Sequence, residues 1–221
     1  MESKYLPLPD QKNYESANNL AYQLACQQLA NIDDLEAQCR KNGAQYRTSD
    51  SQKSITVQYL NQTYFITLPD VTISSLDSPE VTPVRDRILI LHYLLTAKGT
   101  PLTKRLISFH ELPEGNVYYP TFVKRTGQSL TNSFGSNPHL LLETGRKLGG
   151  QKAPYGDMAV TINAFTHVPI TIVLWGGDDE FPPQVNVLFD ATISHYLPTE
   201  DITVLCETIS RRLIRLKRPA S

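Results

Sequence analysis

The sequence contains little cysteine, only three residues in a chain of 221. Cys26, Cys39 and Cys206 are odd in number, widely spaced and free of any CxxC pair. This distribution argues against a disulfide framework and against the cysteine ligands of an iron–sulfur cluster. Because Cys26 and Cys206 lie among apolar residues at helical spacing, we expect buried, unreactive thiols.

The chain also lacks an excess of charge of either sign, with 21 basic residues against 22 acidic ones. Such a balance gives the protein no overall electrostatic attraction for nucleic acid or an anionic membrane, so we expect neither as a partner. The longest apolar stretch, Ile88–Leu95, is interrupted by His92 and is too short to span a bilayer. The start, MESKYLPLPD, lacks the basic region and apolar run of a secretion signal, so we expect a cytoplasmic protein.

Familiar catalytic signatures are scarce as well. The sequence has no GxSxG elbow, HExxH pair or close pair of histidine ligands. Gly176–Phe181 reads GGDDEF, one residue away from the signature loop of diguanylate cyclases, but Pro182 and Pro183 follow at once and should end any strand there. A phosphate loop is not indicated either, because Gln151 stands where lysine is required. These signatures therefore identify neither a catalytic residue nor a cofactor, and both stay unknown from the sequence.

What is present is the composition of an ordinary folded protein, 40% hydrophobic and 19% charged. Apolar residues spaced three or four apart, with capping residues, predict helices over 13–30, 32–41, 82–97, 137–150 and 200–217, and a short one over 119–124. Runs rich in Ile, Val, Thr, Tyr and Phe predict strands over 54–60, 63–68, 71–75, 106–110, 158–165 and 169–175. Because strands and helices do not alternate strictly, we expect a single-domain α+β fold with an antiparallel or mixed sheet.

The helix over 82–97 is apolar on nearly every side and is predicted to be the buried central helix. The last helix has a stripe of apolar residues and should be docked on the domain rather than free, with Arg211, Arg215 and Arg218 facing outward. We interpret residues 1–50 as an N-terminal helical arm and residues 51–221 as one compact α+β domain. The C-terminal basic run, Arg211 to Arg218, could bind an anion or simply compensate the helix dipole and solvate the surface.

The segment from Leu174 to Tyr196 is the best candidate for a site. It places Trp175 and the acids Asp178, Asp179 and Glu180 directly after an apolar strand, where binding loops tend to lie. Together with aromatic residues such as Tyr155, Trp175 could wall an apolar pocket for a small molecule. In the alternative reading, the acids form a solvated turn and Trp175 belongs to the core.

Three further polar residues belong to this hypothesis. Asp190 and His195, with the acids 178–180, could hold a divalent ion or move a proton in a metal-dependent enzyme, although the spacing specifies no metal. His110 ends a predicted strand and could face the same pocket, or it could be a surface strand end. Asp190 could equally cap a helix or turn.

The sequence resembles an uncharacterised prokaryotic family, domain of unknown function 3786. The resemblance covers roughly Ile55 to Leu213. Its carriers are LPEG at Leu112–Gly115, the Phe134–Gly135 pair, Leu148–Gly150 with Gly156 and Asp157, and the block VPITIVLWGGDDEFPPQVNVLFDATISHYLPTED. It implies an anaerobe protein found alongside corrinoid and iron–sulfur methyl-transfer systems, with no established activity.

The expected function is therefore that of a binding or accessory protein. The hypothetical ligand residues are Trp175, Asp178, Asp179, Glu180, Asp190, His195, His110, Tyr155 and Asp157. We expect a corrinoid, or the surface of a corrinoid or redox protein, as the partner. The metal-dependent enzyme remains an alternative, and a purely structural interaction module is a third.

Overall fold

The computed structural model describes residues 11–49 and 52–217. The helices and strands of the first half are α1 (Gln11–Ala30), α2 (Leu35–Asn42), β1 (Gln45–Ser49), β2 (Gln52–Tyr59), β3 (Gln62–Leu68), β4 (Thr72–Ser75), α3 (Val84–Thr96) and β5 (Leu106–Ser108). The second half contains η1 (Phe109–Glu111), α4 (Gly115–Phe122), the π-helical η2 (Val123–Gly127), α5 (Gln128–Phe134), α6 (His139–Lys147), β6 (Gln151–Ala153), β7 (Met158–Phe165), β8 (Val168–Trp175), β9 (Gln184–Asp190), η3 (Ile193–His195) and α7 (Thr199–Lys217).

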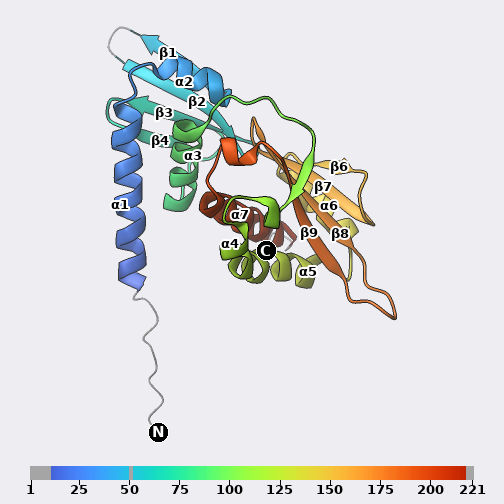
Figure 1. Cartoon of the computed structure of the whole chain (residues 1–221). Helices are drawn as coiled ribbons and strands as arrows, with labels where there is room; N and C mark the ends of the chain where they lie inside the picture. The colour runs from blue at the N-terminus through green and yellow to red at the C-terminus, as the bar shows by residue number, and fades with distance from the viewer. Residues whose placement is uncertain (1–10, 50–51, 218–221) are drawn as a thin grey trace.

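Two antiparallel sheets confirm the α+β prediction. The first sheet has the order β1-β2-β3-β4 and the second the order β5-β9-β8-β7-β6. The β2–β3 hairpin turns at Leu60 and Asn61, both with positive φ, as a two-residue hairpin turn requires. The sequence predicted this hairpin but placed its turn one residue later. Figure 1 shows the two sheets in different parts of the molecule, with helices packed beside both.

Helix α3 is the central buried helix, as predicted. Its residues Ile90, Leu91 and Tyr93 are fully buried, and the helix packs against α1, α2 and α7. Its beginning differs from the prediction, because Pro83 rather than Thr82 occupies the N-cap position and no side chain caps the helix. Helix α2 likewise begins three residues later than the predicted residue 32, at Leu35, with Asp34 as its N-cap.

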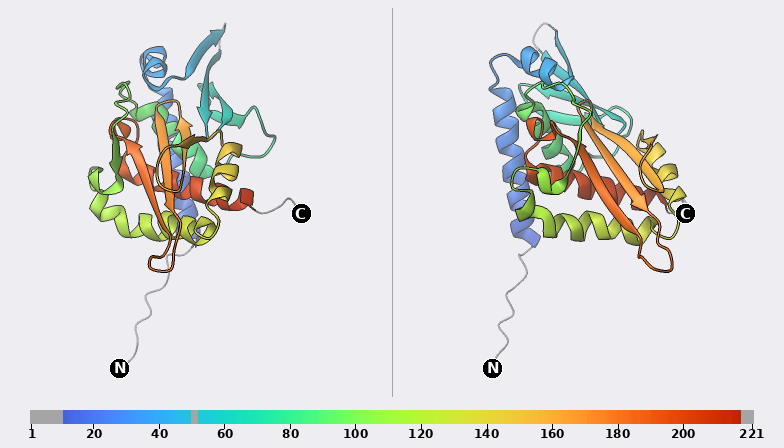
Figure 2. Two further views of the ribbon diagram at one scale, coloured as in Figure 1. Left: turned by 90° about the vertical axis from the view of Figure 1, so that its right-hand side faces the viewer. Right: turned by 45° about the vertical axis from the view of Figure 1, so that its right-hand side comes forward.

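Helix α7 is docked, which confirms the prediction for the last helix. Its stripe is buried and consists of Ile202, Leu205, Cys206, Ile209 and Leu213. It packs against α4, α5 and α6 on the helical side of the second sheet, as the two views of Figure 2 show. The Thr199 hydroxyl donates to the Pro113 carbonyl, so it ties α7 to the preceding chain instead of capping the helix.

Several elements differ from the predictions. Strand β9 begins directly after Pro183, so the expectation that the two prolines end any strand is wrong: they precede the ladder and remove no hydrogen bond from it. Residues 45–49 form β1, which pairs with β2. The predicted boundary between residues 50 and 51 lies outside the described ranges, and the division into an arm and a domain stays a prediction.

Two of the three thiols are buried, which confirms the prediction for Cys206 but only in part for Cys26. Cys39 and Cys206 are buried, and Cys26 is half-buried. Burial raises the pKa of all three thiols, that of Cys39 to about 11. Within the described ranges, no helix is long and apolar enough to cross a membrane.

Candidate functional site

The acidic loop between β8 and β9 is a closed turn. The Asp178 carboxylate accepts hydrogen bonds from the amides of Glu180 and Phe181, at 2.9 and 2.7 Å. These amide hydrogen bonds lower the pKa of Asp178. Asp178 is thus a turn-forming residue, while Asp179 and Glu180 are exposed.

Trp175 and Asp157 lie at the base of this turn. The Asp157 carboxylate accepts a hydrogen bond from the Gly176 amide at 2.8 Å, and Trp175 ends β8 with 39% of its surface exposed. Tyr155 is 43% exposed and precedes Gly156, which packs against the carbonyl of Leu174. The structure therefore brings six of the predicted residues to one end of the second sheet, and leaves the aromatic ones, Tyr155 and Trp175, at its surface.

Asp190 and His195 lie elsewhere and stabilise a loop. The buried Asp190 carboxylate accepts hydrogen bonds from the amides of Thr103, Lys104 and Thr192. Burial alone would raise the pKa of Asp190, but these hydrogen bonds outweigh it and lower the pKa. His195 is exposed, and its Nδ1 lies 2.9 Å from the Thr100 hydroxyl.

These two groups of residues do not meet. Trp175 pairs with Gln184 at the start of β9, and Asp190 lies at the other end of that strand, about 20 Å away at 3.3 Å per residue. The acidic turn and Asp190 cannot share one ion at that separation. Among the residues described, no group of three or more His, Cys, Asp or Glu side chains is arranged to hold a metal.

His110 lies beside a groove between β9 and the helices α4, η2 and α5. Its ring stacks on Tyr119 at 3.7 Å between centroids, and its Nδ1 donates to Asn116 Oδ1 at 2.9 Å. The groove has a volume of about 530 Å³, and Pro183, which follows the acidic loop, lines it together with His110. His110 and Pro183 therefore border the same groove, whereas none of the acids 178–180 lines it.

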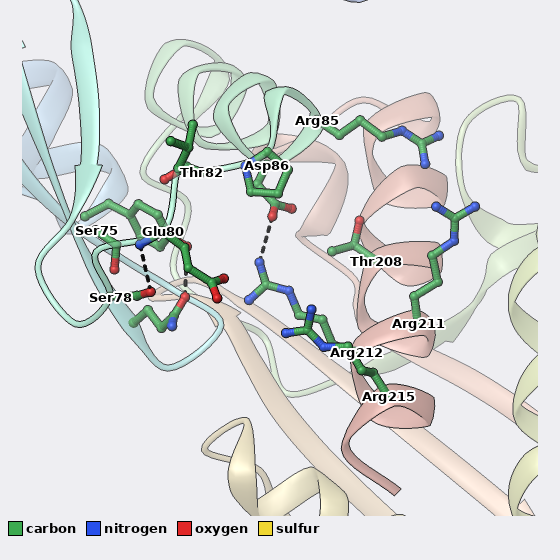
Figure 3. Close-up of a pocket in the computed structure, with 14 residues that line it drawn as sticks. Ser75, Ser78, Glu80, Thr82, Arg85, Asp86, Thr208, Arg211, Arg212 and Arg215 are labelled. Carbon is green, nitrogen blue, oxygen red and sulfur yellow. Dashed lines mark hydrogen bonds and ion pairs between the residues drawn. The ribbon is translucent and has the colours of Figure 1, made fainter. Parts of the chain in front are cut away.

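A second hollow, of about 410 Å³, lies between the segment that follows β4, the first turn of α3, and α7. Its polar lining consists of Arg85, Arg211, Arg212, Arg215, Glu80, Asp86, Gln62, Tyr64, Ser75, Ser78, Thr82 and Thr208. Figure 3 shows the guanidinium groups of Arg212 and Arg215 extending from α7 on the side of Asp86. We call this hollow the arginine pocket.

Arg212 is held in place by buried partners. It donates to Asp86 Oδ2 at 2.7 Å, and its guanidinium lies 5.4 Å from the Tyr59 ring centroid. Tyr59 in turn donates to Asp86 Oδ1 at 2.9 Å. Burial, together with the negative charge of Asp86, raises the pKa of Tyr59 well above its usual value, so the hydroxyl remains a donor.

Glu207 holds further arginines at the edge of the pocket. This buried carboxylate forms ion pairs with Arg85, Arg125 and Arg211. One carboxylate therefore faces three guanidinium groups, and Arg85 and Arg211 both line the pocket. The excess of positive charge is available to an anion.

Arg215 is the most available cation of the pocket. It is exposed, and it forms no ion pair with any acidic residue that the structure describes. An adjoining hollow of about 330 Å³ shares Gln62, Arg212 and Arg215 and adds one basic residue, Lys147, and one acid, Asp77. Hydrogen-bond donors therefore line both the arginine pocket and the adjoining hollow.

The C-terminal basic run is visible in the sequence, but it is equally consistent with compensation of the helix dipole and solvation of the surface. Arg212 was expected in no special role, yet its side chain is only 21% exposed. Lys217 donates to the Ser133 carbonyl, and Arg218 lies outside the described residues. The pair of adjacent arginines at 211 and 212 is the signal that could have revealed the pocket. Neighbouring residues on a helix face different sides, so the two arginines cannot both lie on the outer face of α7.

The fold and the pocket define an α+β protein with a cationic hollow between its last helix and its first sheet. The chain belongs to the family described as Domain of unknown function (DUF3786), whose model matches residues 34–212. This range contains both sheets and α7 as far as Arg212. No curated protein and no solved structure matches the chain.

Proposed function

We propose that this protein binds a small polyanionic ligand, carrying phosphate or carboxylate groups, in the arginine pocket. The observation that carries the proposal is the convergence of four arginines from α3 and α7 on one hollow that also has two acids, Glu80 and Asp86. Guanidinium groups form paired hydrogen bonds with phosphate and carboxylate oxygens, which makes arginine the preferred residue for such ligands.

The pocket's size and its fixed donors support a small molecule. A volume of about 410 Å³ is within the range of small-molecule sites, roughly 300–1,000 Å³. Arg212 is held by Asp86 and Tyr59 before any ligand arrives, so little side-chain entropy is lost at that residue on binding. Thr82 supports the same reading, because its Oγ1 is buried without a hydrogen-bond partner in the described chain.

Thermal shift and calorimetry test this proposal. Inorganic phosphate, citrate and adenosine triphosphate should raise the melting temperature, and the effect should weaken as salt is added, because the binding is electrostatic. Arg215→Gln should weaken binding about tenfold or more, since one good charge-assisted hydrogen bond corresponds to roughly 1.5–3 kcal/mol. The melting temperature of the free protein should remain near that of the wild type.

Arg47→Gln is the matched control. Arg47 is exposed on β1, so this change removes the same charge away from the pocket and should leave affinity unchanged. The proposal fails if none of the three anions binds at millimolar concentration. It also fails if Arg215→Gln and Arg47→Gln reduce binding equally, since that result would indicate an unspecific charge effect.

A second proposal rests on the family resemblance. In it, the protein binds a corrinoid, or the surface of a corrinoid or redox protein. Its structural support is the exposed Trp175 beside the acidic turn. Because the chain has a single tryptophan, quenching of its fluorescence during a cobalamin titration would report binding there. Absence of quenching at high micromolar cobalamin would count against it. Cytoplasmic location also remains a prediction.

A further inference from the structure

Strand β9 has an edge that is only partly paired. On one side it pairs with β8 along its whole length, from Gln184 to Phe189. On the other side the short strand β5 reaches only from Asp190 to Leu188. Within the described chain, Gln184–Val187 therefore has no strand on that side. Such an edge presents free amide and carbonyl groups to an incoming strand.

The groove beside His110 runs along this edge. One wall is the chain from Pro183 to Leu188, and the other is formed by Tyr119, Phe122, Val123 and Gly127. The edge from Gln184 to Leu188 is about 13 Å long at 3.3 Å per residue. The groove is thus open toward a strand edge and backed by helices, the arrangement in which extended peptides add to a sheet.

The chemistry of the groove selects the peptide. Its lining combines apolar side chains, such as Phe122, Val123 and Val187, with uncharged polar ones such as Gln128, Thr131 and Asn132, and contains no Asp, Glu, Lys or Arg. It therefore favours a mixture of apolar and uncharged polar side chains inside. At its Pro183 end lies the turn with the exposed acids Asp179 and Glu180. A basic residue of the peptide would meet these acids, whereas an acidic one would be repelled.

The direction of the peptide follows from the sheet. All pairings of the second sheet are antiparallel, and β5 runs from Asp190 toward Leu188 along β9. A peptide that continues β5 in the same direction reaches the acidic turn with its carboxyl end. Antiparallel pairing is also slightly more stable per residue than parallel pairing.

We propose that the edge Gln184–Val187 binds an extended segment of a partner protein, with alternating apolar residues followed by basic residues at its carboxyl end. The segment continues β5 as an added strand of the second sheet. This site is independent of the arginine pocket, because it is formed by other elements and selects a ligand of opposite charge.

Gly127 offers a test that does not disturb the fold. It lies in the groove wall with helical dihedral angles, and a Cβ atom built there meets nothing within 4 Å. Gly127→Phe should therefore fill the groove without a clash, and its melting temperature should not fall, because glycine is a poor helix former. Gly127→Ala is the matched control that leaves the groove open.

The probe is a fluorescein-labelled peptide, acetyl-Val-Thr-Val-Thr-Lys-Lys-amide, whose binding is followed by fluorescence anisotropy. We expect it to bind the wild type and Gly127→Ala, and to bind Gly127→Phe about tenfold more weakly or worse. The same peptide with N-methylated amides in its Val-Thr segment should lose binding, since only main-chain hydrogen bonds are removed. The double variant Asp179→Asn, Glu180→Gln should bind more weakly than the wild type at low salt.

Three results would overturn the proposal. The first is no binding of the probe at millimolar concentration, and the second is equal binding by Gly127→Phe and Gly127→Ala. The third is a combination of observations: the probe does not bind, light scattering shows that the wild type is a dimer, and the Gly127→Phe variant is a monomer. That result would assign the edge to a second copy of the chain.

Discussion

Asp86 joins three elements through one buried carboxylate. It lies on α3 with 4% of its surface exposed, accepts from Tyr59 of β2 and pairs with Arg212 of α7. The Tyr59 hydroxyl is fully buried and has no water to replace this partner, and the mostly buried Arg212 guanidinium would lose its ion pair. Such a residue is costly to remove because its partners are left unpaired.

Replacing Asp86 by alanine should therefore lower the free energy of unfolding by about 3–5 kcal/mol. Urea unfolding followed by circular dichroism measures the loss. Glu80→Gln is the control, because Glu80 lines the same pocket but is exposed, and it should change stability by less than about 0.5 kcal/mol. Equal effects of the two substitutions would contradict the assigned role of Asp86.

The lowered pKa of Asp190 predicts that the free energy of unfolding falls in acid. Its folded pKa is lowered, so its contribution to stability is complete above the usual aspartate pKa and is lost as the pH falls through the lowered folded value. Asp190→Ala should reduce stability at neutral pH by about 2–4 kcal/mol, because three amides lose their acceptor. Asp190→Asn keeps an oxygen acceptor and should cost less. A loss for alanine that is as large at pH 2 as at pH 7 would rule out the charged carboxylate as the cause.

At the scale of elements, one of the links between α3 and α7 is a histidine–aspartate pair, in which the charge of His92 depends on pH. His92 Nδ1 lies 2.7 Å from Asp201 Oδ2. The hydrogen bond to Asp201 raises the pKa of His92 although burial lowers it. Because the folded pKa is raised, the protonated pair adds stability that is complete below the usual histidine pKa.

That stability should disappear as the pH rises through the folded pKa of His92. Melting temperatures of the wild type and of Asp201→Asn, measured between about pH 5.5 and 8.5, should differ most at the acid end and converge at the alkaline end. Glu200→Gln is a control at the exposed neighbouring position and should preserve most of the dependence. Parallel curves for the wild type and Asp201→Asn would show that this pair is not the source.

The elements predicted from the sequence are those with a strong period or clear ends. Helices α1, α3 and α7 and strands β2, β3, β7 and β8 have such patterns. Of the elements that were missed, β1, β6 and α5 are short or mostly polar, and β9 was missed because two prolines precede it. Their structure depends on partners far along the chain, as when β9 pairs with β8 across the acidic turn.

The same dependence on distant partners explains why the sequence predicted the sites only in part. The sequence predicted a site around the acidic segment and found His110, which does border a groove with Pro183. It could not show that Asp190 lies at the far end of β9, because strand register is set by pairing. Nor could it show that Arg212 meets Asp86, since 126 residues separate them.

At the scale of the whole molecule, α7 is the element that the others share. It packs against α3, α4, α5 and α6, and its buried stripe belongs to the main core. The second sheet contributes to that same core through β7, β8 and β9. The chain should therefore unfold as one cooperative unit.

A chain truncated before Thr199 should not fold. It loses the buried stripe of α7, in which each apolar side chain contributes roughly 1.5–3 kcal/mol, from a total stability of about 5–15 kcal/mol. A circular dichroism melt of the truncated chain should show no cooperative transition. A transition at the full-length temperature would contradict this, and a folded chain that has lost a salt-sensitive affinity for DNA or RNA would instead indicate a nucleic-acid arm.

The three buried or half-buried cysteines make local opening of the native state measurable. Because their thiols are hard to ionise in the folded protein, alkylation by iodoacetamide must wait until the surrounding structure opens. Cys206 would then report the opening of α7, whereas Cys39 would report that of α2. Separate labelling rates, obtained by mass spectrometry of the unaltered chain, would show whether its amino-terminal helices open before the core does.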